Sequence, residues 1–168
     1  MGAVLSYLHS LPPEQVLASF ALLVFLTSLG VVPNNNDLTL AAAGAFSVLK
    51  SIPPVSFIVV AFCAIALGET GVYFLGRIAG GKILASSFFQ KRVSLERLKK
   101  IEMQVNTHPA KLLLGIRIVP VLRPYFILAA GSLGLSPRRF FSAHPVILGT
   151  YVTLLVTVFH YLGRTLAG

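Results

Sequence analysis

The stretches PNNNDLTLAAAG (33–44) and PVLRPYFILAAG (120–131) are two versions of one unit, and the second begins 87 positions after the first. When the whole chain is shifted by this offset, the match continues without a gap well beyond both stretches. Internal duplication in a very apolar chain is typical of transporter-like membrane folds. The coinciding pairs are Val32/Val119, Pro33/Pro120, Ala42/Ala129, Ala43/Ala130, Gly44/Gly131, Leu67/Leu154, Leu75/Leu162, Gly76/Gly163 and Arg77/Arg164.

The composition is that of an integral membrane protein. Of 168 residues, 55% are hydrophobic and 11% charged, and the mean hydropathy is +0.83, whereas soluble domains carry about 25% charged residues. Cys63 lies in an apolar run and the four histidines lack the spacing of a zinc site, so we expect no metal or other cofactor. We predict a single membrane domain with a first repeat at about 16–81, a cytoplasmic linker at 82–111 and a second repeat at about 112–168.

Basic residues are concentrated in the middle of the chain. The net charge is +9, no Lys or Arg precedes Lys50, and the interval from Arg77 to Lys111 holds eight of the fourteen. A basic block between apolar runs follows the positive-inside rule, which places residues 82–111 in the cytoplasm. We therefore expect a membrane partner and no nucleic acid. The start of the chain has no basic region of the kind that precedes a cleaved signal peptide.

One apolar run meets the length of a membrane span, which is about 20 residues, and a second comes close to it. They are 55–79 and 146–163. The other runs are shorter and form two pairs, 16–32 with 38–49 and 112–122 with 125–136, each interrupted by proline and polar residues. Short interrupted segments at corresponding places in two halves indicate re-entrant helical hairpins. We predict an all-α protein in which each repeat is such a hairpin followed by one transmembrane helix.

The topology follows from counting crossings. A hairpin plus one crossing helix traverses the membrane once, so the second repeat runs opposite to the first and the two hairpin tips meet near the midplane. The repeat is then inverted. An alternative in which residues 16–32 form a full span would make the repeat parallel, and the sequence leaves this open.

The linker has an amphipathic segment. In residues 82–106, Leu98, Ile101 and Val105 follow helical spacing while basic residues occupy other positions, and Ser94 can cap the helix start. We expect a helix lying on the anionic inner leaflet. An ordinary solvated helix is the alternative.

Four charged residues, Asp37, Glu69, Arg117 and Arg123, fall where hydrocarbon depth is expected. Each costs about 2.5–3.5 kcal/mol at a helix centre, so such residues pair or line a cavity. Asp37 and Arg123 become neighbours if the hairpin tips meet. Either carboxyl group is then a candidate for proton exchange, and a structural ion pair is the alternative reading.

Two further residues are candidates for substrate contact. Tyr73 follows Glu69 by one helical turn, so the two can line a polar path, or simply hydrogen-bond to one another. Asn36 and its neighbours Asn34 and Asn35 can bind a headgroup, or cap the helix that follows. Helix N-termini after the two breaks favour anions, and guanidinium groups match phosphate, so we predict a phosphate-bearing substrate.

The segments DLTLAAAG (37–44), GETGVYFLGRIAGG (68–81) and RIVPVLRPYFILAAGSLGLSPRRFF (117–141) resemble the DedA family, also called the VTT domain or SNARE-associated Golgi protein family. The resemblance implies a membrane protein with two opposed re-entrant hairpins that translocates lipids. Bacterial members move undecaprenyl phosphate or phosphatidylethanolamine, eukaryotic relatives scramble phospholipids, and dependence on the proton-motive force is proposed for several.

Position by position, Asp37 matches the acid of the family's first hairpin, Glu69 the acid of its G-D/E motif, and Arg117 and Arg123 the arginines of its second hairpin. The chain departs from the family pattern at Thr27-Ser28-Leu29, where many members have a further Glu. It departs again at Asn35-Asn36, which replaces Pro-Gly.

We expect a lipid flippase or scramblase of the bacterial inner membrane that acts on phosphate-bearing lipids, with proton coupling and a homo-oligomeric state left open. The alternatives are an ion- or proton-coupled transporter of a small solute and a non-transporting membrane scaffold. No Ser/His/Asp order or metal-ligand spacing indicates an enzyme.

Overall fold

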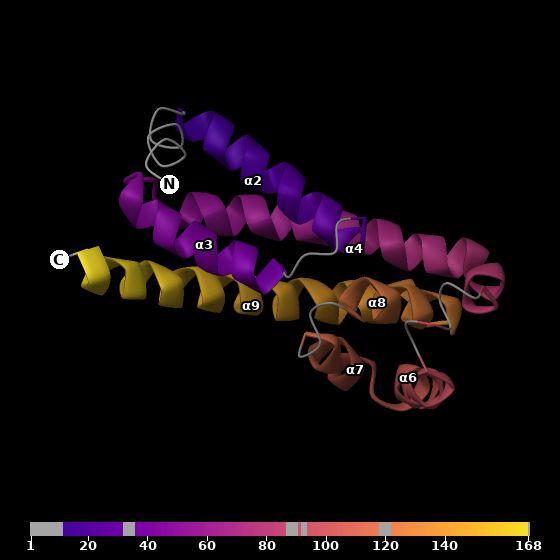
Figure 1. Cartoon of the computed structure of the whole chain (residues 1–168). Helices are drawn as coiled ribbons and strands as arrows, with labels where there is room; N and C mark the ends of the chain where they lie inside the picture. The colour runs from indigo at the N-terminus through magenta and orange to yellow at the C-terminus, as the bar shows by residue number, and fades with distance from the viewer. Residues whose placement is uncertain (1–11, 32–35, 87–90, 92–93, 118–121, 168) are drawn as a thin grey trace.

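The computed structural model describes residues 12–31, 36–86, 91, 94–117 and 122–167. Throughout these residues the regular structure is helical, with seven helices and no strand, which confirms the all-α class (Figure 1). The helices are α2 (Pro13–Ser28), α3 (Asn36–Leu49), α4 (Pro54–Leu84), α6 (Leu95–Thr107), α7 (Pro109–Ile116), α8 (Arg123–Ser132) and α9 (Pro137–Ala167).

The two long helices α4 and α9 run side by side in opposite directions (Figure 1). Each has 31 residues and is long and apolar enough to cross a membrane. At 1.5 Å per residue each spans roughly 45 Å, more than the ~30 Å hydrocarbon layer. Both are longer than the predicted runs 55–79 and 146–163. The additional turns carry basic residues, Lys82 on α4 and Arg138 and Arg139 on α9, which can reach the headgroup region.

α9 begins nine residues earlier than its apolar run and continues through Pro145. A proline inside a helix removes one backbone hydrogen bond, and in membrane helices neighbouring elements compensate for the loss. The sequence run starts at 146 because Pro145, His144 and the two arginines interrupt the hydrophobicity. The structure therefore places Arg138 and Arg139 in the first turn of a helix rather than in a connecting loop.

The short helices form two pairs, α2 with α3 and α7 with α8. The predicted breaks are Pro33–Asp37 and Arg123-Pro124. Residues 33–35 fall outside the described residues, whereas Asn36 and Asp37 begin α3, and Arg123 and Pro124 begin α8. α2 has 16 residues, fewer than the roughly 20 needed for a full span.

Each half packs its short helix on the long helix of the other half: α3 lies on α9, and α8 lies on α4. The repeated glycines make these two contacts. A Cβ atom on Gly44 would lie 2.6 Å from the carbonyl oxygen of Val156 and 2.9 Å from the backbone nitrogen of His160. A Cβ atom on Gly131 would overlap the carbonyl oxygen of Tyr73. Tyr73 and His160 are themselves separated by the repeat offset, so the two glycines make the same kind of contact with the long helix of the other half, one helical turn apart.

This close approach predicts the effect of one added methyl group. We expect Gly131→Ala to destabilise the fold by about 1–3 kcal/mol, because the methyl group meets backbone that cannot move alone. Gly81→Ala is the matched control, since no atom lies within 4 Å of a Cβ built there, and its better helix propensity should stabilise slightly. Thermal unfolding of both variants in detergent measures the difference, and equal midpoints would contradict the close contact.

The predicted linker at 82–111 is divided among several elements. Residues 82–84 complete α4 and residues 109–111 begin α7. Between them, α6 starts at the predicted cap, where the Ser94 hydroxyl accepts a hydrogen bond from the Arg97 N–H at 3.4 Å. Its apolar residues Ile101 and Val105 are buried against α7 and α8. Protein therefore covers this apolar stripe, and the position of the helix on the inner leaflet stays a prediction.

Candidate functional site

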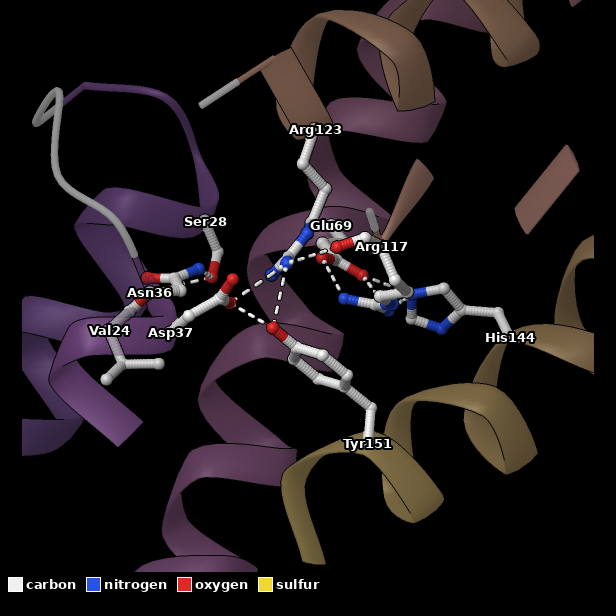
Figure 2. A network of polar contacts seen from close by, with 9 residues as sticks. All are labelled: Val24, Ser28, Asn36, Asp37, Glu69, Arg117, Arg123, His144 and Tyr151. Carbon is white, nitrogen blue, oxygen red and sulfur yellow. Dashed lines mark hydrogen bonds and ion pairs between the residues drawn. The ribbon is translucent and has the colours of Figure 1, made fainter. Parts of the chain in front are cut away.

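A layer of buried polar side chains separates two apolar clusters. One cluster gathers residues of α2, α3, α4 and α9, including Ile65 and Leu148, and the other gathers residues of α4, α6, α7, α8 and α9, including Val72 and Phe140. Glu69 lies between the clusters on α4, and His144 and Tyr151 flank Leu148 on α9. Figure 2 shows these side chains converging with those of Asp37, Arg117 and Arg123. The layer is placed deep in the molecule by two helices that are otherwise apolar.

Glu69 and Arg117 form a buried, two-pronged ion pair. The guanidinium donates from Nη1 to Oε1 at 2.8 Å and from Nη2 to Oε2 at 2.7 Å. Both side chains are almost fully buried, 1% and 6% exposed. Arg117 lies directly after the last residue of α7, so the C-terminal end of a short helix presents it to the middle of α4. Two parallel charge-assisted bonds fix both groups in position.

His144 contacts the same carboxylate. Its Nε2 atom lies against Glu69 Oε2 and 3.3 Å from Arg117 Nη2, and its ring stacks on Phe140 with centroids 4.5 Å apart. One imidazole nitrogen either donates or accepts, and cannot do both. If Nε2 carries a proton, it donates to Glu69; if it does not, the carboxyl group must carry the proton for the contact to be favourable. The Glu69–His144 contact therefore holds one proton.

Arg123 is the centre of the second half of the network. Its Nη2 atom donates to Asp37 Oδ1 at 3.1 Å, to the Tyr151 hydroxyl at 3.3 Å and to the carbonyl oxygen of Arg117 at 3.4 Å. The Tyr151 hydroxyl in turn donates to Asp37. The guanidinium carbon also lies 5.2 Å from the centroid of the Tyr151 ring, within cation–π range. Tyr151 thus connects the acid and the base.

The remaining donors of Arg123 have no partner among the described residues. Its Nε and Nη1 atoms are buried and have no hydrogen-bond partner within the described part of the chain, and its side chain is 3% exposed. Buried donors are nearly always satisfied, so an orphaned pair indicates a missing partner such as an ion or ligand. The neighbouring Asp37 side chain is 26% exposed, which makes its side of the layer the one that a partner can reach.

Four of the six predicted site residues come together in this layer: Asp37, Glu69, Arg117 and Arg123. The predicted proximity of Asp37 and Arg123 is confirmed. Their ion pair connects α3 with α8, and only one guanidinium nitrogen, Nη2, takes part in it. The pairing of Glu69 with Arg117 was not among the predicted contacts.

Asn36 is directed elsewhere. Its amide nitrogen donates to the Ser28 hydroxyl at 3.1 Å, and its amide oxygen accepts from the Thr27 hydroxyl. All three side chains are buried. Asn36 therefore connects the start of α3 to the end of α2, and its contact with a headgroup stays a prediction. Asn34 and Asn35 lie outside the described residues.

Tyr73 also lies apart from the layer. Its hydroxyl donates to the backbone carbonyl of Leu135 at 2.5 Å, and Arg77 Nη1 lies 3.4 Å from the same carbonyl. The expected hydrogen bond with Glu69 is thus replaced by one to the turn between α8 and α9. The ring stacks on Phe140 at 4.3 Å, so Tyr73 supports the face of Phe140 opposite His144.

Sequence reasoning missed His144 and Tyr151. A signal was present, because the two polar residues are seven positions apart in an apolar helix and therefore share one face. The histidines were considered only as metal ligands. Within the described residues, no group of three or more His, Cys, Asp or Glu side chains is placed to hold a metal ion.

Comparison with known proteins assigns the family. Residues 32–163 match the family model of the VTT domain. A Haemophilus influenzae protein named "Uncharacterized membrane protein" is 28% identical over 102 residues, which cover 60% of this chain and 48% of that protein. The chain therefore spans about half the length of that curated relative, and no solved structure matches it. The family match covers most of the chain and includes every residue of the buried layer, so the protein belongs to the VTT domain family of membrane proteins, also known as DedA.

Proposed function

We propose that the protein translocates a phosphate-bearing lipid, such as undecaprenyl phosphate or a phospholipid, between the two leaflets of the bacterial inner membrane. The main support for this proposal is that two buried donors of Arg123, Nε and Nη1, have no hydrogen-bond partner among the described residues. Leaving a buried donor unsatisfied costs about 1–3 kcal/mol. A phosphate oxygen supplies the acceptors that the described residues lack, and guanidinium is the side-chain group that suits phosphate best.

The depth of the layer favours a substrate that crosses the membrane. Glu69 is the middle residue of α4, with fifteen helical residues on either side, and Tyr151 is one residue from the middle of α9. A phosphate at Arg123 would thus lie about halfway through the membrane, where it is most costly to place a charge in hydrocarbon. A protein site at this depth lowers the barrier that a headgroup meets during translocation.

The proposal includes the predicted membrane arrangement, with one domain of two inverted repeats and two re-entrant hairpins whose tips face each other. Three features support it: the opposite directions of α4 and α9, the exchange of short helices between halves, and the equivalent roles of Gly44 and Gly131. The short length of α2 favours a half-hairpin over a full span.

Protons enter the proposed cycle at two places. An arriving phosphate competes with Asp37 for Arg123, and protonation of Asp37 would remove that competition without leaving a buried unpaired carboxylate. The single proton held between Glu69 and His144 gives a second exchangeable position beside Arg117. Transport driven by a proton gradient would move protons through these groups in each cycle. Passive scrambling would move lipid without transferring protons through them.

Two tyrosine-to-phenylalanine substitutions test whether translocation depends on the buried polar layer and not on the residues around it. We expect Tyr151→Phe to slow lipid translocation several-fold, since it removes the hydroxyl between Asp37 and Arg123. Tyr73→Phe makes the same chemical change outside the layer. It should cost about 0.5–1.5 kcal/mol of stability through the lost bond to Leu135, yet leave translocation unchanged. Equal effects of the two substitutions on the translocation rate would contradict this assignment.

The proposed function is tested by reconstituting the full chain in proteoliposomes with fluorescent polyprenyl phosphate or fluorescent phospholipids and measuring headgroup exposure at each surface. We expect movement that is lost in Asp37→Asn and Arg123→Ala proteins that still fold. Flux of a small solute without lipid movement would identify a solute transporter instead. Absence of either flux from folded protein would leave the scaffold reading.

A further inference from the structure

A groove separate from the buried layer lies where α6, α7 and α8 meet. It encloses about 300 Å³ and is lined by Arg97, Lys100, Ile101, Gln104, Leu112, Gly115, Ile116 and Phe126. The lining has two distinct parts, a polar rim from α6 and an apolar floor from all three helices. None of the described residues that line it is acidic.

The rim consists of Arg97, Lys100 and Gln104, all exposed. Their spacing of three and four residues places them on one face of α6. Lys100 also pairs with Glu96 at 3.1 Å, but both side chains are largely exposed, and such surface pairs contribute little. A phosphate group can therefore replace Glu96 as the partner of Lys100 at small cost.

The floor is apolar and buried. Ile101, Leu112 and Ile116 are between 3% and 5% exposed, and Phe126 is 8% exposed. Gly115 contributes no side chain, and no atom lies within 4 Å of a Cβ built on it. Inorganic phosphate needs only the rim. A cationic rim above an apolar floor instead fits a molecule that has an anionic head and a hydrocarbon tail.

The groove is placed at the interface of the membrane. In Figure 1, α6 is seen nearly end-on, so it lies across the direction of α4 and α9, close to the end of α4. Lys82 of α4 and Arg138 and Arg139 of α9 belong to the ends of these helices on the same side, whereas Arg164 is at the opposite end of α9. By the positive-inside rule this is the cytoplasmic side, where the leaflet carries anionic lipids.

We propose that this groove is a binding site for an anionic phospholipid of the inner leaflet, with the phosphate at Arg97 and Lys100 and the first acyl carbons over Ile101, Ile116 and Phe126. The site does not depend on translocation. The groove would bind a lipid at the surface whether or not the buried layer translocates lipid. Lipid binding at the groove can therefore be detected even if the translocation experiment gives a negative result.

Charge substitutions with a matched control test the rim. The full chain in detergent is titrated with phosphatidylglycerol or phosphatidylcholine, and bound lipid is counted by native mass spectrometry. We expect a preference for phosphatidylglycerol that falls about fivefold in Lys100→Gln or Arg97→Gln, as for loss of one basic contact with an anionic lipid. Lys99→Gln makes the same charge change on the same helix outside the groove, and should keep the preference.

Filling the groove tests the floor. Gly115→Leu adds a side chain in open space, so the fold should persist while phosphatidylglycerol binding is lost. Gly81→Leu is the control, because the space around a Cβ on Gly81 is equally open. Unfolding midpoints verify that each variant folds. Should Gly115→Leu unfold, the smaller Gly115→Val and the charge series decide the question.

Three results would overturn the proposal: wild-type protein without preference for phosphatidylglycerol, an equal loss in Lys99→Gln and Lys100→Gln, or unchanged binding in a folded Gly115 variant. The first would show that charge does not select the lipid, and the second would indicate attraction by overall charge. Inorganic phosphate should compete only weakly, and competition at the concentration of the lipid itself would show that the floor contributes nothing.

Discussion

Arg123→Lys is expected to lower the rate of lipid translocation by about 10- to 100-fold while the protein remains folded. Lysine keeps the positive charge and can still pair with Asp37. It lacks the planar set of donors in which Nε and Nη1, which have no partner among the described residues, could bind a phosphate. Each hydrogen bond between charged groups contributes about 1.5–3 kcal/mol, which corresponds to this range of rates. The measurement is headgroup exposure of fluorescent lipid in proteoliposomes.

Arg164→Lys provides the control for that experiment. It is the same chemical change at an exposed arginine of α9, and it should leave the rate unchanged. If folded Arg123→Lys protein translocated lipid as fast as wild type, the guanidinium would act only as a structural charge, as the scaffold interpretation requires.

Glu69→Gln is expected to destabilise the protein by about 3–5 kcal/mol. The substitution leaves Arg117 buried and charged without its carboxylate, and removing one partner of a buried ion pair has a cost of this size. The amide group also presents N–H donors toward a guanidinium that has only donors. Unfolding in detergent with increasing denaturant measures the loss, and Glu96→Gln, at an exposed ion pair, should change stability by no more than about 1 kcal/mol.

Replacing both partners separates stability from function. We expect Glu69→Met combined with Arg117→Met to recover most of the stability lost in Glu69→Gln, since buried ion pairs can be replaced by apolar side chains of similar volume at little cost. The double variant should nevertheless fail to translocate lipid. A double variant as unstable as the single one would mean that the pair specifies the fold in addition to stabilising it.

The fold was predictable from sequence where hydrophobicity and repetition dominate. The repeat offset aligns Gly44 with Gly131, and the structure uses both glycines for the same kind of helix contact. Charge also had predictive value. Four ionisable residues in apolar surroundings require partners of opposite charge. The two acidic residues lie in the first half and the two arginines in the second, which indicated that the four side chains meet in one layer.

The partners themselves depend on tertiary geometry. Tyr73 lies one turn from Glu69, yet its hydroxyl reaches Leu135, 62 residues later, because α8 packs on α4 at this level. Glu69 pairs with Arg117 because α7 ends beside the middle of α4. Spacing within a helix defines a face, but which element covers that face is decided by packing between segments distant in the sequence.

His144 illustrates a related limit. Its polarity and the following proline divided the hydrophobic pattern, so the sequence placed a helix start near residue 146, whereas α9 begins at Pro137. Only when the helix is continuous do His144 and Tyr151 lie on the face that meets α4 and α7. The local sequence underestimates the length of such a helix, because neighbouring helices stabilise the turns that the sequence alone does not favour.

The most direct test of the central proposal is whether a lipid phosphate contacts Arg123. Solid-state NMR of the full chain, with ¹⁵N-labelled arginine in bilayers containing the translocated lipid, can detect dipolar coupling between ³¹P and guanidinium nitrogens. In protein that carries Arg97→Lys, which removes the arginine of the proposed groove, we predict a coupling that persists when Arg164→Lys is added and disappears when Arg123→Lys is added. Coupling that is unchanged in folded Arg123→Lys protein, or that arises only from the exposed arginines, would contradict a phosphate site in the buried layer.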